Sequence, residues 1–527
     1  MKLYYNGDIL TMEEELYASA VVVDEGRIVA VGSYETLMEA YRDAKRIDLK
    51  GRCLMPAFLD AHSHITAFSN TLGLVHLEQC QTFDDIVQTL QDYVKQHSLQ
   101  KDEWIIGFGY DHNFLKEKQH PDRFVLDEVS LDHPIVITHI SGHMGVVNTK
   151  ALELLGITEE TCVSGGLIGR DASGQATGYL EEKAFMEVSS HMPPATLEQV
   201  AQRFSQAEDI YLQNGITTAQ DGLTKAADWS ILKMLASRQK LRLDIVSYID
   251  VKDHERFVDD NQEYVNQYVN HLKIGGYKVI LDGSPQGRTA WLTRPYLPIS
   301  KQECGYPVYT DDQVKSFIRT AIDHNVQLLA HCNGDAAADQ FLNCFHWCCK
   351  KYKVDRVMRP VMIHAQTVRD DQLERMKSLG MIPSFFIAHT YYWGDVHLKN
   401  LGEERAFHIS PVKEAIANDL VYTFHQDTPV ILPNMLETIW CAVNRVSKNG
   451  IVMGRKEQIS TLEALRGVTI YAAYQYFEEE QKGSIRPGKL ADLVILDRNP
   501  LKVDPMRLKQ IQVVETIKNG ETLYQKK

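Results

Sequence analysis

The sequence lacks the features that mark membrane, secreted and nucleic-acid-binding proteins. No apolar run approaches the ~20 residues that span a bilayer, and the first residues, 1–8, lack the apolar core of a secretory signal. The 527 residues carry a net charge of -14, and no basic tract is concentrated enough to neutralise a row of phosphates. We therefore expect neither a membrane nor a nucleic acid as a partner.

The sequence also lacks the even set of cysteines that forms a disulfide framework. Its nine cysteines are odd in number and scattered along the chain, which is typical of reduced thiols in a cytoplasmic enzyme. The composition, 44% hydrophobic and 24% charged, is that of a soluble globular protein. A chain of this length is too long for one ordinary core but suits a large α/β barrel with a smaller second domain.

Short strand-like segments occur at both ends of the chain. Residues 2–5, 20–23 and 27–31 alternate with turns, and residues 491–496 and 513–517 flank a loop that contains proline. Asn519-Gly520 then marks a hairpin turn. We predict one small β domain made of residues 1–55 and 476–527.

The middle of the chain alternates strands with helices, as a parallel barrel does. The sequence predicts an α/β barrel over residues 56–430, followed by a helical C-terminal part over residues 431–475. Residues 134–138 also read as a strand and would make a ninth, so we interpret residues 66–195, approximately, as an α/β insertion after the first barrel strand, lying over the barrel mouth. The eight predicted barrel strands are 57–61, 217–221, 243–249, 276–281, 327–331, 361–364, 382–387 and 421–426.

Histidines and other polar residues lie at or near the ends of several predicted strands. His62 and His64 follow the first strand, and because side chains two apart in a strand point the same way, both can bind one metal ion. The carboxyl ends of barrel strands converge on one rim, so residues far apart in sequence are expected to meet there. The other members of this predicted group are Lys278, His331, His364 and Asp427.

Each of these positions has a simpler interpretation when it is taken alone. A single histidine that closes an apolar strand is usually a core residue, Lys278 is explained as well by a salt bridge, and Asp427 by capping the turn before Pro429. The joint pattern favours a metal site, because six residues would otherwise have to fall at strand ends of one barrel by accident.

Six motifs spread over nearly the whole length resemble the amidohydrolase superfamily, and within it the amidohydrolase family 3 branch that includes N-substituted formamide deformylases. The segment that begins at His389 resembles this branch in particular, whereas the first and last motifs are found across the superfamily. The motifs are Pro56-Ala57-Phe58-Leu59-Asp60-Ala61-His62-Ser63-His64, Ser141-Gly142-His143, Asp282-Gly283-Ser284, His331-Cys332-Asn333-Gly334-Asp335, His389-Thr390-Tyr391-Tyr392-Trp393-Gly394-Asp395 and Gly483-Ser484-Ile485-Arg486-Pro487-Gly488-Lys489-Leu490-Ala491-Asp492-Leu493.

The resemblance implies a distorted (β/α)8 TIM barrel beside a β-sandwich, with one or two divalent metal ions held by His62, His64, His331 and His364. Zinc is the favoured ion, because it suits a nitrogen-rich site. Lys278 matches the position of a carboxylated lysine that bridges two metals in related enzymes, and Asp427 matches an aspartate that is both metal ligand and proton shuttle. Many relatives have a small residue where this chain has His425-Gln426, which allows different neighbours for that aspartate.

Further residues are expected near the substrate. His143 is predicted to be catalytic, as a donor to the substrate carbonyl or the oxyanion, or else to be a turn histidine. Arg288 either attracts a carboxylate on the substrate or pairs with a neighbouring acid. The predicted substrate-binding residues, all on predicted loops, are Asp111, Arg288, His389 and Trp393.

The sequence thus predicts a metal-dependent hydrolase of a carbon–nitrogen bond in a small-molecule amide, with conversion of an N-substituted formamide to amine and formate as the most specific form. Hydrolysis of a cyclic amide, a carbamate or an ester is the alternative within the same fold. A metal-free, non-catalytic scaffold is the alternative from another class. We expect a homodimer.

Overall fold

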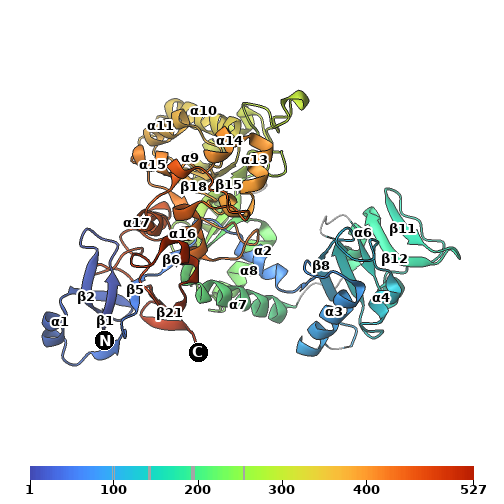
Figure 1. Cartoon of the computed structure of the whole chain (residues 1–527), viewed down its shortest axis with the longest axis horizontal. Coiled ribbons are helices and arrows are strands. Elements are labelled where there is room, and N and C mark those ends of the chain that lie inside the picture. The colour runs from blue at the N-terminus through green and yellow to red at the C-terminus, as the bar shows by residue number, and fades with distance from the viewer. Residues whose placement is uncertain (98, 100, 140–143, 192–195, 253–255) are drawn as a thin grey trace. The chain divides into compact units, whose positions relative to one another are not determined.

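The computed structural model describes the chain except for residues 98, 100, 140–143, 192–195 and 253–255 (Figure 1). The chain divides into two compact units, one made of Met1–Phe68 with Phe204–Lys527 and the other of Ser69–Arg203. Among the described residues, no helix has both the length and the apolar character needed to cross a membrane.

An eight-stranded parallel sheet forms the centre of the first unit. The eight predicted barrel strands are all present, and the spatial order of the sheet runs from β19 through β18, β17, β16, β15, β14 and β13 to β6. The carboxyl ends of these strands therefore lie along the same edge, and the prediction of a parallel α/β barrel is confirmed. The strands are β6 (Phe58–Leu59), β13 (Ile216–Thr224), β14 (Asp244–Asp250), β15 (Leu272–Ile280), β16 (Gln327–Cys332), β17 (Val361–His364), β18 (Ile382–Phe385) and β19 (Thr423–Phe424).

The first and last strands of this curled sheet are joined just beyond their carboxyl ends. The backbone N–H of Asp427 donates to the carbonyl of His62 at 3.3 Å, and the N–H of His64 donates to the carbonyl of Thr428 at 2.8 Å. These two bonds link the segment after β6 to the segment after β19. The barrel is thus closed at its carboxyl rim, by the residues that were predicted to carry the chemistry.

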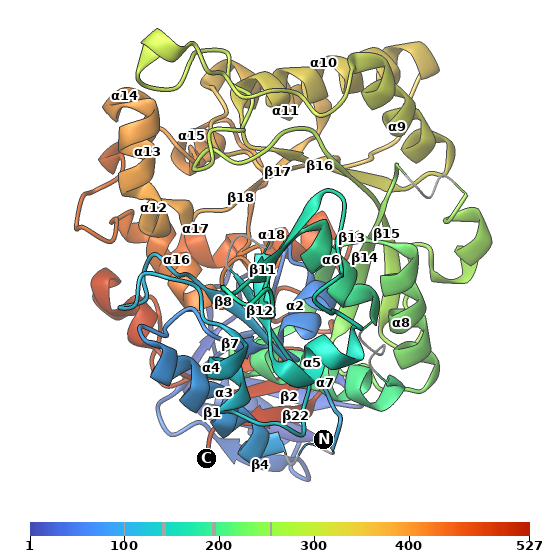
Figure 2. The same cartoon turned by 90° about the vertical axis from the view of Figure 1, so that its right-hand side faces the viewer.

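Helices follow the barrel strands and cover the outer face of the sheet. Figure 2 shows α9, α10 and α11 outside the strands β15 to β17. Their ends follow local sequence signals: Thr310 and Gln313 form a capping box at the start of α9, and Gly380 ends α11 in the left-handed conformation. The helices are α7 (Leu197–Gln213), α8 (Ala226–Ser237), α9 (Asp311–Asp323), α10 (Asp335–Tyr352), α11 (Asp370–Leu379), α12 (His389–Tyr392), α13 (Gly394–Leu401), α14 (Glu403–Phe407), α15 (Val412–Ala417), α16 (Met435–Asn444), α17 (Thr461–Gly467) and α18 (Ile470–Gln475).

The two ends of the chain meet in a second sheet. Strand β1 pairs with β4 through its first residues and with β5 through Asp8 and Ile9, so the sheet branches there. Tyr4, Ile9 and Leu54 from the N-terminal part share one apolar core with Ile495 and Ile517 from the C-terminal part. The strands are β1 (Lys2–Leu10), β2 (Tyr17–Asp24), β3 (Arg27–Gly32), β4 (Lys45–Asp48), β5 (Cys53–Pro56), β20 (Leu493–Leu496), β21 (Val513–Lys518) and β22 (Glu521–Gln525), and helix α1 (Tyr34–Ala40) packs beside them.

The second unit, Ser69–Arg203, is an α/β fold of its own. Its six-stranded sheet has the order β11-β12-β10-β9-β8-β7, in which β7, β8 and β9 are parallel and the others are antiparallel. The strand expected at 134–138 is β9 of this sheet. The elements are β7 (Val75–His76), β8 (Ile105–Tyr110), β9 (Ile135–His139), β10 (Met144–Val147), β11 (Gly166–Arg170), β12 (Ala176–Glu182), α3 (Phe83–His97), α4 (Arg123–Asp127), α5 (Thr149–Leu154) and α6 (Lys183–His191).

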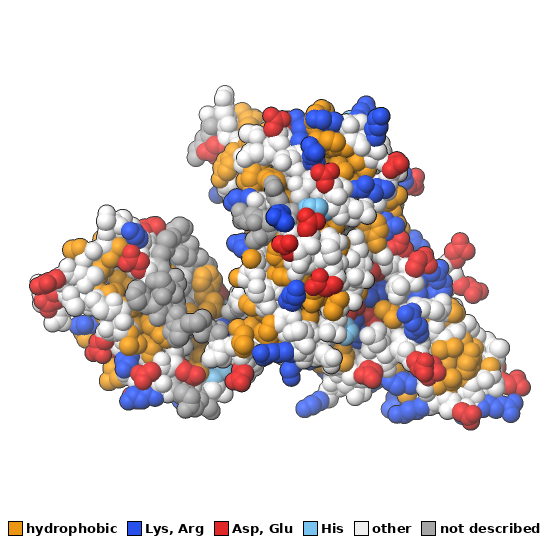
Figure 3. Space-filling view, turned by 180° about the vertical axis from the view of Figure 1, so that it is seen from behind, with side chains coloured by type: hydrophobic (Ala, Val, Ile, Leu, Met, Phe, Trp, Pro, Cys, Tyr) orange, Lys and Arg blue, Asp and Glu red, His pale blue; other side chains and the backbone are white. Residues whose placement is uncertain are grey.

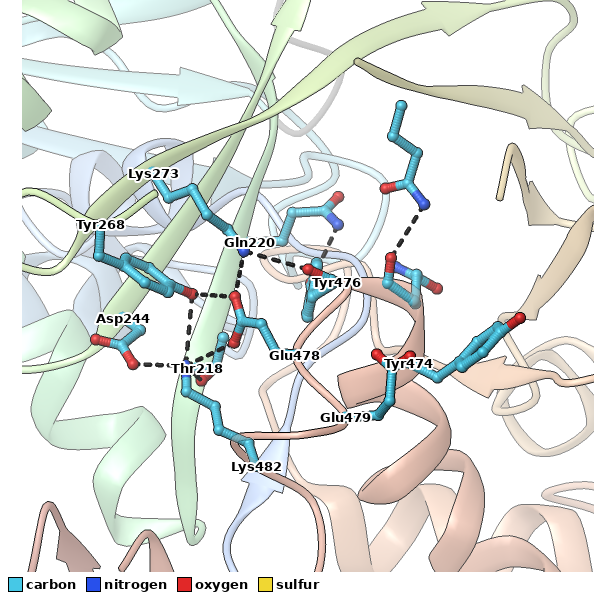
Figure 4. A network of polar contacts seen from close by, with 12 residues as sticks. Thr218, Gln220, Asp244, Tyr268, Lys273, Tyr474, Tyr476, Glu478, Glu479 and Lys482 are labelled. Atoms are coloured by element: carbon cyan, nitrogen blue, oxygen red, sulfur yellow. Dashed lines mark hydrogen bonds and ion pairs between the residues drawn. The ribbon is translucent and has the colours of Figure 1, made fainter. Parts of the chain in front are cut away.

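A group of charged side chains is buried at the amino ends of the barrel strands. On the face in Figure 3, surface charges of both signs are interspersed, whereas Figure 4 shows interior charges that are directly paired. Lys482 Nζ lies 2.6 Å from Asp244 Oδ2 at the start of β14 and 2.7 Å from Glu478 Oε2. Lys273 of β15 also pairs with Glu478, and Tyr268 donates its hydroxyl to the same carboxylate at 2.8 Å. Burial raises the pKa of Glu478, but Lys273 and Lys482 outweigh it and lower that pKa to about 2.

Removal of the positive charge of Lys482, which pairs with both Asp244 and Glu478, is expected to destabilise the fold. Lys482→Ala leaves Asp244 and Glu478 buried beside one cation fewer, and breaking a buried pair costs about 3–5 kcal/mol. The free energy of unfolding, measured by urea denaturation, should fall by that amount. Lys502→Ala is the matched control, because its ion pair with Asp8 lies at the surface and should cost less than about 1 kcal/mol. Equal losses in the two variants would contradict the assignment.

Candidate metal centre

Four of the predicted ligands lie at the carboxyl rim of the barrel. His62 and His64 follow β6, His364 is the last residue of β17, and Asp427 follows β19. Their positions result from the rim bonds between the segments that follow β6 and β19, which bring the two ends of the sheet together. Residues more than 360 positions apart therefore share one site.

The distances between the ligand atoms are those of a metal site. His62 Nε2 and His64 Nε2 lie 3.3 and 3.2 Å from Asp427 Oδ1, and His364 Nε2 lies 4.0 Å from Asp427 Oδ2. Ligands held about 2.0–2.2 Å from a tetrahedral ion are about 3.3 Å from one another. Lys278 Nζ, from β15, lies 3.1 Å from His62 Nε2. One ligand atom each of His62, His364 and Asp427 lie within 4.8 Å of one another, so these three side chains are placed to share one cation.

The bonding of Asp427 also fits a cation. Its Oδ1 atom is buried, and none of the described residues gives it a hydrogen bond of ordinary geometry, although two imidazole nitrogens face it. A buried carboxylate oxygen without a donor is costly. A divalent ion between the carboxylate and the imidazoles satisfies all three atoms, and the donor set of nitrogen and carboxylate suits zinc.

His331, in β16, belongs to the same group. Its ring centroid lies 4.4 Å from that of His364, and its Nδ1–H donates to Asp282 Oδ1 at 3.2 Å. The Asp282 carboxylate accepts backbone N–H bonds from Asn333 at 2.9 Å and Gly334 at 2.7 Å, which fix it in place. Asp282 therefore orients the ring of His331 and leaves the lone pair on Nε2, which accepts from the Asn333 amide at 3.3 Å and which a metal ion would take in its place.

Sequence reasoning missed Gln220, which orients His62. Its Oε1 accepts the Nδ1–H of His62 at 2.5 Å, and its Nε2 donates to the carbonyl of Ala61 and to the hydroxyl of Tyr476. This arrangement selects the tautomer of His62 that presents Nε2 to Asp427. Gln220 lies within β13, and nothing in its strand pattern distinguishes it from an ordinary buried polar residue.

A chain of two hydrogen bonds orients the ring of His364. Its Nδ1 lies 3.2 Å from Nε2 of His425, whose Nδ1 lies 3.0 Å from the hydroxyl of Ser384. In the tautomer that leaves Nε2 of His364 for a metal, its Nδ1–H donates to His425, and the Nδ1–H of His425 donates to Ser384. The departure of this chain at His425 thus supplies a hydrogen-bond partner for a candidate ligand.

Burial keeps two candidate ligands, His62 and His364, in the state that binds metal. It lowers the pKa of both rings well below the usual histidine range, and the positive charge of Lys278 beside His62 acts in the same direction. These two imidazoles are therefore neutral at neutral pH. Burial also lowers the pKa of Lys278, to about 8, against the opposing effect of Asp427.

Two of the predicted substrate-binding residues form an aromatic wall beside His364. His389 is buried and its ring lies 4.6 Å from that of Trp393. The ring of Phe386 lies 4.7 Å from His389 and 6.1 Å from His364, which connects the wall to the candidate ligands. His389 Nδ1 is held at 3.0 Å from His397 Nε2. Phe386 and His389 are buried, and Trp393 is the partly exposed member of this wall.

Arg288 and Asp111, two other predicted substrate residues, contact charged or titratable partners. Arg288 pairs with Glu303 at 3.1 Å and stands over the ring of Tyr296, which corresponds to the second of its two predicted interpretations. Asp111 belongs to the Ser69–Arg203 unit, where it lies 3.4 Å from His139. His143 falls outside the described residues.

Comparison with known proteins finds similar hydrolase families and relatives. A family model described as "Amidohydrolase family" matches residues 45–524, and a model of the imidazolonepropionase-like composite domain of bacteria matches residues 20–44. The chain is 27% identical to protein LONG AFTER FAR-RED 3 of Arabidopsis thaliana, over 94% of this chain and 87% of that protein. It is 26% identical to N-substituted formamide deformylase of Arthrobacter pascens, over 97% and 95%.

Among solved structures, an uncharacterized metal-dependent hydrolase of Pyrococcus furiosus is similar with a TM-score of 0.78 and 25% identity, covering 95% of this chain and all of that one. The family resemblance read from the motifs is thereby confirmed.

Loss of the Gln220 contact is expected to weaken metal binding. Gln220→Leu removes the acceptor that orients His62, and loss of such a partner typically lowers metal affinity about 10–100-fold. Gln220→Glu keeps the acceptor for His62 but gives up the amide donor to Ala61 and Tyr476, so it should lose less affinity than Gln220→Leu. Competition with a chelator for Zn²⁺ measures both, with Gln213→Leu, at an exposed position of α7, as the control. An unchanged affinity in Gln220→Leu would rule out this orienting role.

Proposed function

This chain belongs to the amidohydrolase family and is a metal-dependent hydrolase; we propose that it cleaves a carbon–nitrogen bond in a small amide, with an N-substituted formamide as the substrate class. The observation that carries the proposal is the placement of the Asp427 carboxylate 3.2–3.3 Å from two imidazole nitrogens at the barrel rim. A carboxylate in that position can bind the ion and still reach a water beside it.

We propose that His62, His64, His331, His364 and Asp427 hold a divalent ion, and that this ion is zinc. When bound, such an ion lowers the pKa of a water toward ~7 and polarises the carbonyl that is attacked. Asp427 then accepts the proton of the water and returns it to the leaving nitrogen. His62 and His64 would bind the ion on the side of the Asp427 carboxylate. The hydrogen bond from His62 to Gln220 keeps the ring of His62 in the orientation for binding.

Lys278 decides between one and two ions in this proposal. It is fully buried, and its pKa near 8 leaves a sizeable neutral fraction at physiological pH. A neutral amine is the form that reacts with carbon dioxide to give a carboxylated lysine, which supports a bridge between two ions. As a plain amine 3.1 Å from His62, Lys278 instead favours a single ion.

The aromatic wall supports an amide with an apolar substituent. Phe386 and His389 are buried beside His364, and Trp393, which packs against both of them, is partly exposed. An aromatic or alkyl group on the substrate nitrogen can pack against Trp393, with its carbonyl turned toward the candidate ligands. An N-substituted formamide carries such a group on its nitrogen and only a hydrogen on its carbonyl carbon.

The same site also suits a cyclic amide, a carbamate or an ester, since all place a carbonyl beside an activated water. A metal-free, non-catalytic scaffold is less well supported, because the imidazoles and the Asp427 carboxylate at the barrel rim are groups that bind metal ions. We also propose that the protein is located in the cytoplasm, because its nine free thiols suit a reducing compartment.

Substitution of Asp427 tests its role as proton shuttle. Asp427→Asn keeps the shape and an oxygen ligand but loses the base, so kcat should fall about 10²–10⁴-fold while most of the metal stays bound. Turnover and metal content are measured on the same preparations. Asp419→Asn, at an exposed position, is the control. Near-normal turnover in Asp427→Asn would remove it from this role.

A substrate screen tests the bond and the substrate class. Zinc-loaded enzyme is given N-substituted formamides, longer N-acyl amines, hydantoins, carbamates and esters, with amine or acid release as the readout. We expect the highest kcat/KM for formamides with an aromatic or alkyl nitrogen substituent. A clear preference for esters or cyclic amides would contradict the proposed bond, and a purified protein that binds no transition metal at neutral pH would contradict the hydrolase itself.

A further inference from the structure

A second group of metal-binding side chains lies in the Ser69–Arg203 unit. Strands β8 and β9 of this unit are parallel neighbours, with Tyr110 paired to His139, so their carboxyl ends lie side by side. Asp111 and His112 directly follow β8, and His139 is the last residue of β9. Because the carboxyl ends of neighbouring parallel strands lie together, as they do at the barrel rim, a carboxylate and two imidazoles meet at the edge of this smaller sheet.

The ligand atoms of this group converge on a common point. Asp111 Oδ1 lies 3.4 Å from His139 Nε2 and 3.8 Å from His112 Nδ1, and the two imidazole nitrogens are 3.2 Å apart. Ligands of a tetrahedral zinc ion are about 3.3 Å from one another. The three separations are thus close to those of the three protein ligands of an ion whose fourth position is open.

His112 Nδ1 and His139 Nε2 face each other across 3.2 Å, where an N–H of one ring donates to the lone pair of the other. A metal ion between the two nitrogens would replace this shared proton and take an electron pair from each ring. The carboxylate of Asp111 supplies negative charge to the same point.

We propose that Asp111, His112 and His139 bind a divalent transition-metal ion, with Zn²⁺ as the fitting member of the class. Two imidazoles and one carboxylate form a donor set that zinc uses with water in the fourth position. His139 is nearly buried, whereas the side chains of His112 and Asp111 are 28% and 17% exposed. The ion can therefore enter from solvent and keep a water.

Neighbouring aromatic residues hold the ligands in place. The ring of His120 stacks on that of His112 at 4.0 Å, and Tyr110 lies 3.0 Å through its hydroxyl from Nδ1 of His120. Asp111 Oδ1 also accepts hydrogen bonds from the backbone and side chain of Asn113, at 2.8 and 3.0 Å. Hydrogen bonds to a ligating carboxylate are usual in metal sites, where they fix its orientation.

Metal counting on the full chain tests this proposal. Each protein is stripped with a chelator, dialysed against Zn²⁺ and analysed for bound metal. We expect His112→Gln/His139→Gln to bind one ion fewer per chain than the wild type. The control His76→Gln/His97→Gln changes two exposed histidines of the same unit and should bind as the wild type does. Equal metal content in the wild type and in His112→Gln/His139→Gln would overturn the proposal.

A second set of variants separates this site from the barrel site. His62→Gln/His64→Gln should lose metal from the barrel rim but keep the ion of the Ser69–Arg203 unit. Adding His112→Gln/His139→Gln to it should remove that remaining ion. With Co²⁺ as the probe, the absorption bands that remain in His62→Gln/His64→Gln should disappear in the fourfold variant. Bands that persist there would assign the ion to other residues, and the absence of any ion from His62→Gln/His64→Gln would equally overturn the site.

Discussion

Two backbone hydrogen bonds at the barrel rim are the constraint on which the site depends. They join Asp427 to His62 and His64 to Thr428, and so close a sheet whose first and last strands are only two residues long. Because the bonds are made by the backbone of the candidate ligands themselves, closure of the barrel and assembly of the site are one event. The imidazoles of His62 and His64 reach Asp427 only when the ends of the sheet meet.

This rim is supported from inside the barrel by the C-terminal segment. The hydroxyl of Tyr476 donates to the carbonyl of Asp60 at 2.5 Å and accepts from Gln220, which in turn holds His62. Two residues further on, Glu478 enters the buried ion-pair group at the amino ends of the strands. One short segment therefore connects the charged base of the barrel with a candidate ligand at its rim.

The strands and the ligands could be predicted because their signals are local. Apolar runs mark most of the eight strands, and a histidine or aspartate directly after such a run is visible without the fold. The outer strands were predicted too long, at 57–61 and 421–426, because the backbone of Asp60 bonds to Thr218 and that of His425 to Phe385 instead of continuing a regular ladder. The role of Gln220 was not predictable, because its partner His62 is 158 positions away and only the closed barrel brings them together.

The two histidine groups differ in what surrounds their carboxylates, and this difference would make the proposed rim site bind metal more tightly than the proposed site of the smaller unit. At the rim, Asp427 Oδ1 is buried without a hydrogen bond of ordinary geometry from a described residue, so a cation replaces an unfavourable state. In the smaller unit, Asp111 Oδ1 already accepts two hydrogen bonds from Asn113 and is partly exposed to water, so a cation gains less there. His62 is 1% exposed whereas His112 is 28% exposed, and water competes more strongly for the open site. On these two proposals, the same arrangement of parallel strand ends would give a buried, tighter metal site in one sheet and a more exposed, weaker one in the other.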